Sequence, residues 1–109
     1  EMIVNNLPLI SPDADFASLV NIITSGQLGL AIVELEQGVG IITDGDVRRA
    51  FSKYNKNVFD VPAKELMSTS PKTIPLESKM ADAFALMERH HITSLIVLDK
   101  NKPVGILKK

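Results

Sequence analysis

The chain has 109 residues, a formal net charge of −1, 45% hydrophobic residues and no cysteine. This composition indicates one domain, or two tightly paired half-domains, with a true hydrophobic core; it excludes a disordered chain, a disulfide framework and thiolate metal sites. The charge gives no general attraction to nucleic acid or to an anionic membrane, and no apolar run approaches the roughly 20 residues that span a bilayer, so we expect a cytoplasmic protein.

A repeat organises the whole chain. When the sequence is shifted by 64 positions, residues 10–33 fall on residues 74–97, with apolar residues on apolar ones. One further residue in the next loop places Val39-Gly40-Ile41 on Val104-Gly105-Ile106. Matching apolar positions predict matching buried faces, so each copy is expected to be the same supersecondary unit. Two such units can close over one another about an approximate two-fold axis, which leaves a cleft for a ligand between them.

The first copy is predicted to begin with an extended segment and a helix. Residues 7–10 form the extended segment. Pro12 suits the first turn of the helix, Asp13 and Asp15 suit its positive end, and Gly26 suits its stop. The helix face is set by apolar residues at the i, i+3, i+4, i+7 spacing, namely Phe16, Leu19, Val20 and Ile23.

A hairpin and a second helix complete the first copy. Strands at residues 30–35 and 39–43 are joined by three residues, short enough for a hairpin. Residues 43–46 open the next helix, whose apolar face consists of Val47, Ala50, Phe51 and Tyr54.

The second copy repeats this pattern after a polar connector at residues 52–62. Ser78 is its expected helix N-cap. The predicted elements are a short helical turn at 63–67, a strand at 72–74, a helix through Met80, Ala83, Phe84 and Met87, and a hairpin of strands 94–99 and 103–107. The chain then stops where the first copy continues into a helix, so we interpret it as a piece of a longer protein whose uncovered apolar surface favours self-association.

The strongest candidate for a binding site is the segment from Gly40 to Asp46. A buried strand ends there and a helix begins, with free backbone N–H groups that attract phosphate. The Thr43 hydroxyl can donate to a phosphate oxygen, Asp46 can accept from the vicinal hydroxyls of a ribose, and Gly40 lets a flat base approach the strand. The alternative is that Thr43 or Asp44 only caps the helix, and the spacing favours the two interpretations equally.

Other polar residues give weaker signals. Arg48 and Arg49 can neutralise a phosphate, although such a pair more often forms solvated surface. His90 and His91 point about 100° apart on a helix, so they make poor metal ligands. His91 or Thr93 is expected to border the second cleft, because these residues lead into the strand that matches residues 30–35. The sequence contains no recognisable set of nucleophile and base, so we predict a binding module with no catalytic residue, metal or cofactor.

These residues resemble a known family. The repeated unit that ends in Gly40-Ile41-Ile42-Thr43-Asp44-Gly45-Asp46 is similar to a pair of CBS domains, also called a Bateman module. The likeness covers essentially the whole chain and implies an α/β fold of two β-α-β-β-α repeats related by a pseudo-two-fold axis. The repeats are residues 1–56 and 57–109, the second being truncated at its C-terminal helix. In CBS families the Thr and the final Asp of this motif commonly contact the phosphate and ribose of a nucleotide, roles that carry onto Thr43 and Asp46.

A narrower likeness concerns D-arabinose 5-phosphate isomerases, which carry a C-terminal CBS pair. The runs from Thr43 to Arg49 and from His91 to Ser94 resemble that family. The resemblance implies a parent enzyme that converts D-ribulose 5-phosphate to D-arabinose 5-phosphate for Kdo synthesis, with its sugar-isomerase domain N-terminal to this piece. In the second repeat Lys108 stands where Thr43 stands in the first, so an equivalent second site is in doubt.

Two hypotheses about function follow. In the first, the module senses a nucleotide or nucleotide-sugar such as CMP-Kdo and biases the attached isomerase domain; the candidate ligand-binding residues are Gly40, Ile41, Thr43, Asp44, Asp46, Arg48, His91 and Thr93. In the second, the pair is an assembly module without a ligand, whose helix with Val47, Ala50, Phe51 and Tyr54 packs on a second chain. In either case we expect a homo-oligomer that binds neither nucleic acid nor membrane.

Overall fold

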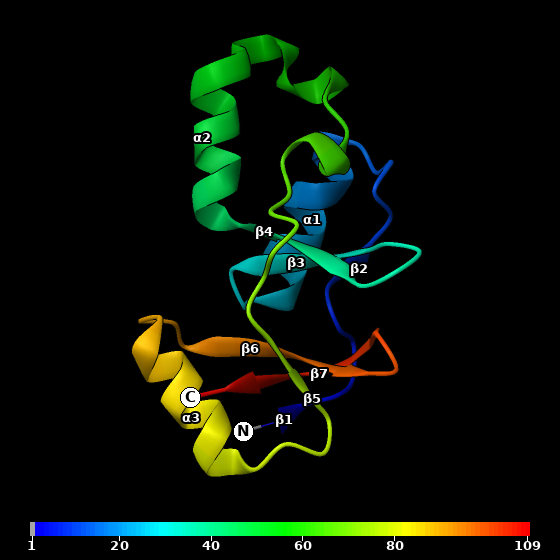
Figure 1. Ribbon diagram of the computed structural model, residues 1–109. Helices are drawn as coiled ribbons and strands as arrows, with labels where there is room; N and C mark the ends of the chain where they lie inside the picture. Colours follow the sequence, from blue (N-terminus) through cyan, green and yellow to red (C-terminus); the bar gives the residue numbers. More distant parts are fainter. Residues whose placement is uncertain (1) are drawn as a thin grey trace.

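The computed structural model describes residues 2–109 and consists of two small sheets packed face to face, with helices outside them (Figure 1). One sheet has the strand order β2-β3-β4 and the other β1-β7-β6-β5. In chain order the elements are β1 (Met2–Ile3), β2 (Leu9–Ile10), α1 (Phe16–Gly26), β3 (Leu30–Glu34), β4 (Val39–Thr43), α2 (Asp44–Tyr54), the 3-10 helices η1 (Asn55–Asp60) and η2 (Ala63–Glu65), β5 (Thr73–Pro75), α3 (Met80–Arg89), β6 (Ser94–Asp99) and β7 (Lys102–Lys108).

The two copies fold with the same topology and register, which confirms the predicted repeat. In the first, β2 pairs in parallel with β3, and β3 pairs antiparallel with β4; β5, β6 and β7 do the same in the second. Ile10 lies opposite Val33, and its equivalent Ile74 lies opposite Val97. The one extra residue of the second copy forms a bulge, because the register shifts from Val97↔Gly105 to Leu98↔Pro103.

Helix α1 begins later than Pro12 suggests, and α3 has a different N-cap from the expected one. The Asp15 side chain accepts a hydrogen bond of 2.8 Å from the Ser18 N–H, which caps α1 at Phe16 and leaves Pro12 outside the helix. Lys79, without a side-chain cap bond, takes the N-cap position of α3. Ser78 instead uses its backbone N–H in a turn to the Pro75 carbonyl.

The core has three parts, and the alternation of strand residues separates them. One face of β3, including Ala31 and Val33, packs under α1 in the first repeat, and the equivalent face of β6 packs under α3 in the second. The opposite faces meet one another across the molecule. Their contact, which we call the seam, is centred on fully buried residues from both sheets, namely Ile32, Ile96 and Ile106.

Two parts of the chain cross between the repeats in space. Strand β1 pairs antiparallel with β7, so residues 2–3 complete the sheet of the second repeat (Figure 1). In the other direction, Val58 and Ala63 belong to the core of the first repeat. The division at residues 56 and 57 therefore stays a prediction about the sequence repeat, since each segment contributes residues to the sheet or core of the other repeat.

The outer faces of the two repeats differ. In the first repeat α2 and η1 cover α1: the Phe51 and Phe59 rings stand edge-on to Phe16 at 5.1 and 5.7 Å, and Phe16 is only 1% exposed. Its equivalent on α3, Met80, is 53% exposed. Of the α2 face that we expected to meet a second chain, Ala50 is buried in the first core and Val47 and Tyr54 pack partly against it, while Phe51 is 48% exposed. Contact of this face with a second chain therefore stays a prediction.

Candidate functional site

The start of α2 is fixed by a capping box. Thr43 is the N-cap: its hydroxyl accepts a hydrogen bond of 3.4 Å from the Asp46 N–H, and Asp46 Oδ2 accepts one of 2.9 Å from the Thr43 N–H. The Thr43 hydroxyl also lies 3.1 Å from Asp46 Oδ2, to which it donates. The capping interpretation is therefore confirmed for Thr43 but not for Asp44, which is the first residue of the helix.

Asp46 is held at both of its oxygens. Arg49 Nη2 lies 2.6 Å from Asp46 Oδ1, while Oδ2 faces Thr43. Partial burial by itself raises the pKa of the Asp46 carboxyl, but hydrogen bonds from Thr43 and Arg49, with the Arg49 charge, outweigh burial and hold the pKa below its ordinary value of 3.8. Asp46 is therefore an ionised acceptor at neutral pH.

A cleft of about 250 Å³ opens between the two sheets beside Thr43. We call it the inter-sheet cleft. Strands β3 and β4 line it with Leu30, Ile41 and Thr43. The segment before β5 lines it with Ser70, Pro71 and Lys72. Strand β6 lines it with Ser94, Leu95 and Ile96, and Ile92, just before this strand, also contributes. Both repeats thus contribute walls, most of them apolar, with hydroxyl groups and one ammonium group among them.

The connector reaches the cleft because it is tied to β4. Ile41 and Ser68 exchange two backbone hydrogen bonds, of 3.0 and 2.9 Å, in an antiparallel bridge. Gly40 makes this approach possible: a Cβ built there lies 2.6 Å from Met67 Sδ and 3.2 Å from the Ser68 carbonyl oxygen. The missing side chain of Gly40 is therefore explained by the approach of Met67 and Ser68, and its contact with a flat base stays a prediction.

The remaining predicted residues lie around the cleft rather than in its wall. Asp44 faces Gly29: its N–H donates to the Gly29 carbonyl at 3.0 Å, and its Oδ2 lies 3.1 Å from a Cβ built at Gly29. Arg48 is exposed on α2. His91 and Thr93 are exposed too, while their neighbours Ile92 and Ser94 line the cleft.

Sequence reasoning missed the polar residues that the second repeat and the connector supply. Ser94 occupies the position of Leu30 in the repeat, and both line the cleft, so the shift by 64 positions was a usable signal for it. Ser70 and Lys72 carried no such signal, because their place depends on the bridge between Ser68 and β4.

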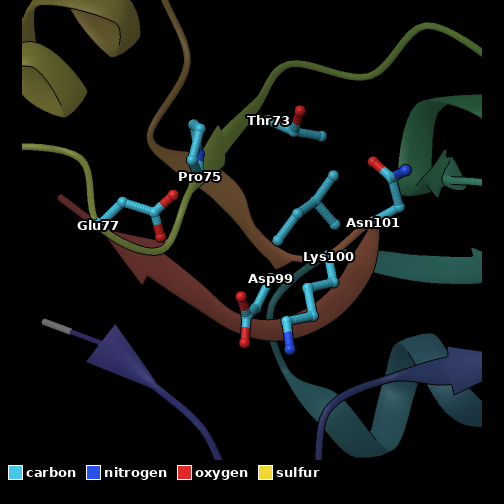
Figure 2. Close-up of a pocket in the computed structure, with 7 residues that line it drawn as sticks. Thr73, Pro75, Glu77, Asp99, Lys100 and Asn101 are labelled. Atoms are coloured by element: carbon cyan, nitrogen blue, oxygen red, sulfur yellow. The ribbon is translucent and has the colours of Figure 1, made fainter.

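A second cavity, of about 320 Å³, lies at the tip of the β6–β7 hairpin, and Figure 2 shows its lining side chains. We call it the hairpin pocket. It is formed by Thr73, Pro75, Glu77, Leu98, Asp99, Lys100 and Asn101, all from the second repeat. None of the residues predicted for ligand binding lies there, and the first sheet contributes nothing to its wall. The inter-sheet cleft, which contains Thr43 and Ile41, is therefore the better candidate site.

Residues 2–109 were also compared with the requirements of a metal site and of a membrane-spanning helix. Within that range no group of three or more acidic, His or Cys side chains could hold a metal ion. Among the helices of those same residues, none has both the length and the apolar character that crossing a membrane requires.

Comparisons with known proteins agree on one family. The sequence pattern of the CBS domain matches residues 63–109. The chain is 38% identical over 104 residues to a probable arabinose 5-phosphate isomerase of Haemophilus influenzae, covering 94% of this chain and 31% of that protein. It is 32% identical over 111 residues to the arabinose 5-phosphate isomerase KpsF of Escherichia coli, covering 99% of this chain and 34% of that protein.

A solved structure shares the fold. A CBS domain protein from Pyrobaculum aerophilum, complexed with AMP, superposes with a TM-score of 0.76 at 22% identity, over 92% of this chain and 78% of that one. The chain spans about a third of the length of the isomerases that it matches.

The lowered pKa of Asp46 predicts a pH-dependent stabilisation. Because the folded state favours the ionised carboxyl, this contribution is present above pH 3.8 and is lost as the pH falls through the lower folded-state value. We expect Asp46→Asn to lower the free energy of unfolding by about 1 kcal/mol at neutral pH, and expect the difference from the parent protein to shrink in acid. Urea denaturation of both proteins across the acid range measures it.

The matched control is Asp44→Asn, two residues earlier in α2, because the capping box joins Thr43 to Asp46 and not to Asp44. Asp15, whose pKa is lowered by the hydrogen bond from Ser18, is present in all three proteins and cancels in the differences. The prediction is contradicted if the loss in free energy of unfolding caused by Asp46→Asn stays constant into strong acid.

Proposed function

Because the chain is a tandem pair of CBS domains that resembles about a third of each arabinose 5-phosphate isomerase, we propose that it is the regulatory module of such an enzyme. The module binds a nucleotide or a nucleotide-sugar in the inter-sheet cleft. The catalytic sugar-isomerase domain, which converts D-ribulose 5-phosphate to D-arabinose 5-phosphate in Kdo synthesis, belongs to the rest of the parent protein.

One observation carries the proposal: the inter-sheet cleft lies next to Thr43 and takes its walls from both repeats. Its apolar part suits a flat base, and its volume of about 250 Å³ is close to the roughly 300 Å³ at which pockets for small molecules begin. Thr43 lines the cleft, and the ionised Asp46 is hydrogen-bonded to it from the neighbouring groove. The Thr43 hydroxyl suits a phosphate oxygen, and the Asp46 carboxylate suits the ribose hydroxyls. The AMP complex of the Pyrobaculum protein supports this class of ligand.

The cleft also suggests how binding is passed on. A ligand between the sheets touches β4, the connector and β6 at once, so it favours whichever arrangement of these three parts fits it better. Such a ligand shifts the equilibrium only by its difference in affinity for the two arrangements. CMP-Kdo is the effector that we propose for the parent enzyme, since a nucleotide-linked sugar acid made later in the same sequence of reactions is a suitable feedback signal.

Calorimetry with AMP and with CMP-Kdo tests the binding function. We expect binding of at least one of them, and expect Asp46→Ala to weaken it about tenfold or more because hydrogen bonds to a charged group are lost. Asp99→Ala, in the hairpin pocket, is the matched control and leaves the affinity unchanged. Binding that is insensitive to Asp46→Ala, or sensitive to Asp99→Ala, contradicts the assignment; no heat and no shift in Tm with either compound contradicts the function.

The exposed side of α3 favours assembly as a second function. Leu76 and Met80, with Met2 of β1, line a hollow of about 110 Å³ on this side, and Phe84 on the same helix is 40% exposed. Clustered apolar side chains of this kind are typical of protein contacts. We propose that a second copy of the chain covers them in solution.

Sedimentation equilibrium tests the assembly function. We expect Met80→Lys to convert an oligomer to a monomer, because the added charge would be buried in the contact. Asn101→Lys, on the exposed hairpin tip, adds the same charge elsewhere and serves as the control. A parent protein that is monomeric at all concentrations, or an oligomer that survives Met80→Lys, rules this surface out.

A further inference from the structure

The Arg49 side chain is 73% exposed, and its guanidinium reaches back along α2 to Asp46. Its Nη2 lies 2.6 Å from Asp46 Oδ1, and Nη1 and Nη2 lie 3.3 and 3.4 Å from a Cβ built at Gly45. The guanidinium therefore lies over residue 45, where a side chain would crowd it. The two ion pairs within residues 2–109 join Arg49 to Asp46 and Lys64 to Asp13, and neither includes Arg48.

Asp46 and its hydrogen-bond partner Thr43 line two separate cavities. Thr43, on its Oδ2 side, lines the inter-sheet cleft. Asp46 itself, together with Arg49 on its Oδ1 side, lines a groove of about 150 Å³ between α2 and η2, which also contains Lys53, Tyr54 and Glu65. Of the two cations in this groove, Lys53 lies over the Tyr54 ring at 5.2 Å from its centroid, so Arg49 is the one that holds Asp46.

The hydrogen bonds of Asp46 limit how a ligand can use it. An ionised carboxylate accepts about four hydrogen bonds. Oδ2 already accepts from the Thr43 N–H and hydroxyl, and Oδ1 accepts from Arg49. A vicinal diol brings two donors, so one existing bond must open. The bond from the Thr43 hydroxyl is the one that can open, because this hydroxyl can turn its proton toward an acceptor on a ligand in the cleft. Arg49 lines the groove and keeps its bond to Asp46 Oδ1.

We propose that Arg49, not Arg48, is the positioning residue of the ligand site: it fixes the Asp46 carboxylate from the groove side while the cleft side exchanges Thr43 for the ligand hydroxyls. This inference rests on the proposed function, in which Asp46 receives the ribose. Gly45 favours the arrangement, since with a Cβ there the guanidinium would have to shift by a few tenths of an ångström. A ligand recognised in this way carries both a vicinal diol and a nearby acceptor.

Measured affinities for AMP and for 2′,3′-dideoxy-AMP test the inference. Both compounds carry the same phosphate, so their affinity ratio isolates the contribution of the ribose hydroxyls. We expect Arg49→Ala to lower this ratio about fivefold, because the carboxylate must then be immobilised on binding. Arg49→Lys, which keeps a donor and the charge, is expected to restore part of the ratio. Arg48→Ala removes the same charge from the neighbouring residue and leaves the ratio unchanged.

The outcomes separate this inference from the proposed function. An exposed ion pair at i, i+3 spacing contributes little to folding, so Arg49→Ala is expected to keep the parent Tm, and its binding data then concern the site alone. If AMP does not bind the parent protein, or if Asp46→Ala keeps the parent ratio, the proposed function fails. If Asp46→Ala brings the affinity ratio close to one but Arg49→Ala leaves the ratio unchanged or raises it, the proposed function stands and the positioning role of Arg49 is overturned.

Discussion

The contact between the two sheets is the constraint on which the rest of the structure depends. Each sheet must bury both faces, and its helix covers only one of them. The other face is apolar because Ile32 in β3 and its repeat equivalent Ile96 in β6 point the same way, and the two meet with Ile106 in the seam. Since the sheets are held together there, the inter-sheet cleft beside Thr43 has walls from both repeats. Because both repeats form the cleft, the affinity of a ligand there depends on how the two repeats are arranged.

The start of α2 shows how structural and binding roles share residues. Thr43 and Asp46 form a capping box, so their presence is already explained by the orphan N–H groups of a helix end. Their position beside the cleft is what makes them candidate ligand contacts as well. A sequence motif cannot separate these roles, because the same hydroxyl and carboxylate satisfy both. The second repeat has Lys108 at the position of Thr43, and so the two halves of the pair are unequal in chemistry although equal in topology.

Much of the fold was predictable because it follows from periodicity. The strands, the helix faces and the duplicated register all arise from apolar spacing, which the sequence displays directly. Contacts between distant segments were not predictable in this way. The pairing of β1 with β7 and the bridge between Ile41 and Ser68 join residues with no periodic relationship. For the same reason the sequence identified Thr43 and Ile41 but missed Ile92 and Ser94, which also line the cleft, and it gave no sign that Met67 lies against Gly40.

The most direct test of the central claim is a backbone NMR titration of the chain with AMP. A single site at the seam predicts that the amides of Ile41 and Thr43 in the first sheet, Lys72 in the connector and Ser94 in the second sheet shift together and saturate with one dissociation constant. Shifts that are confined to one repeat, or that centre on Glu77 and Lys100 in the hairpin pocket, contradict it.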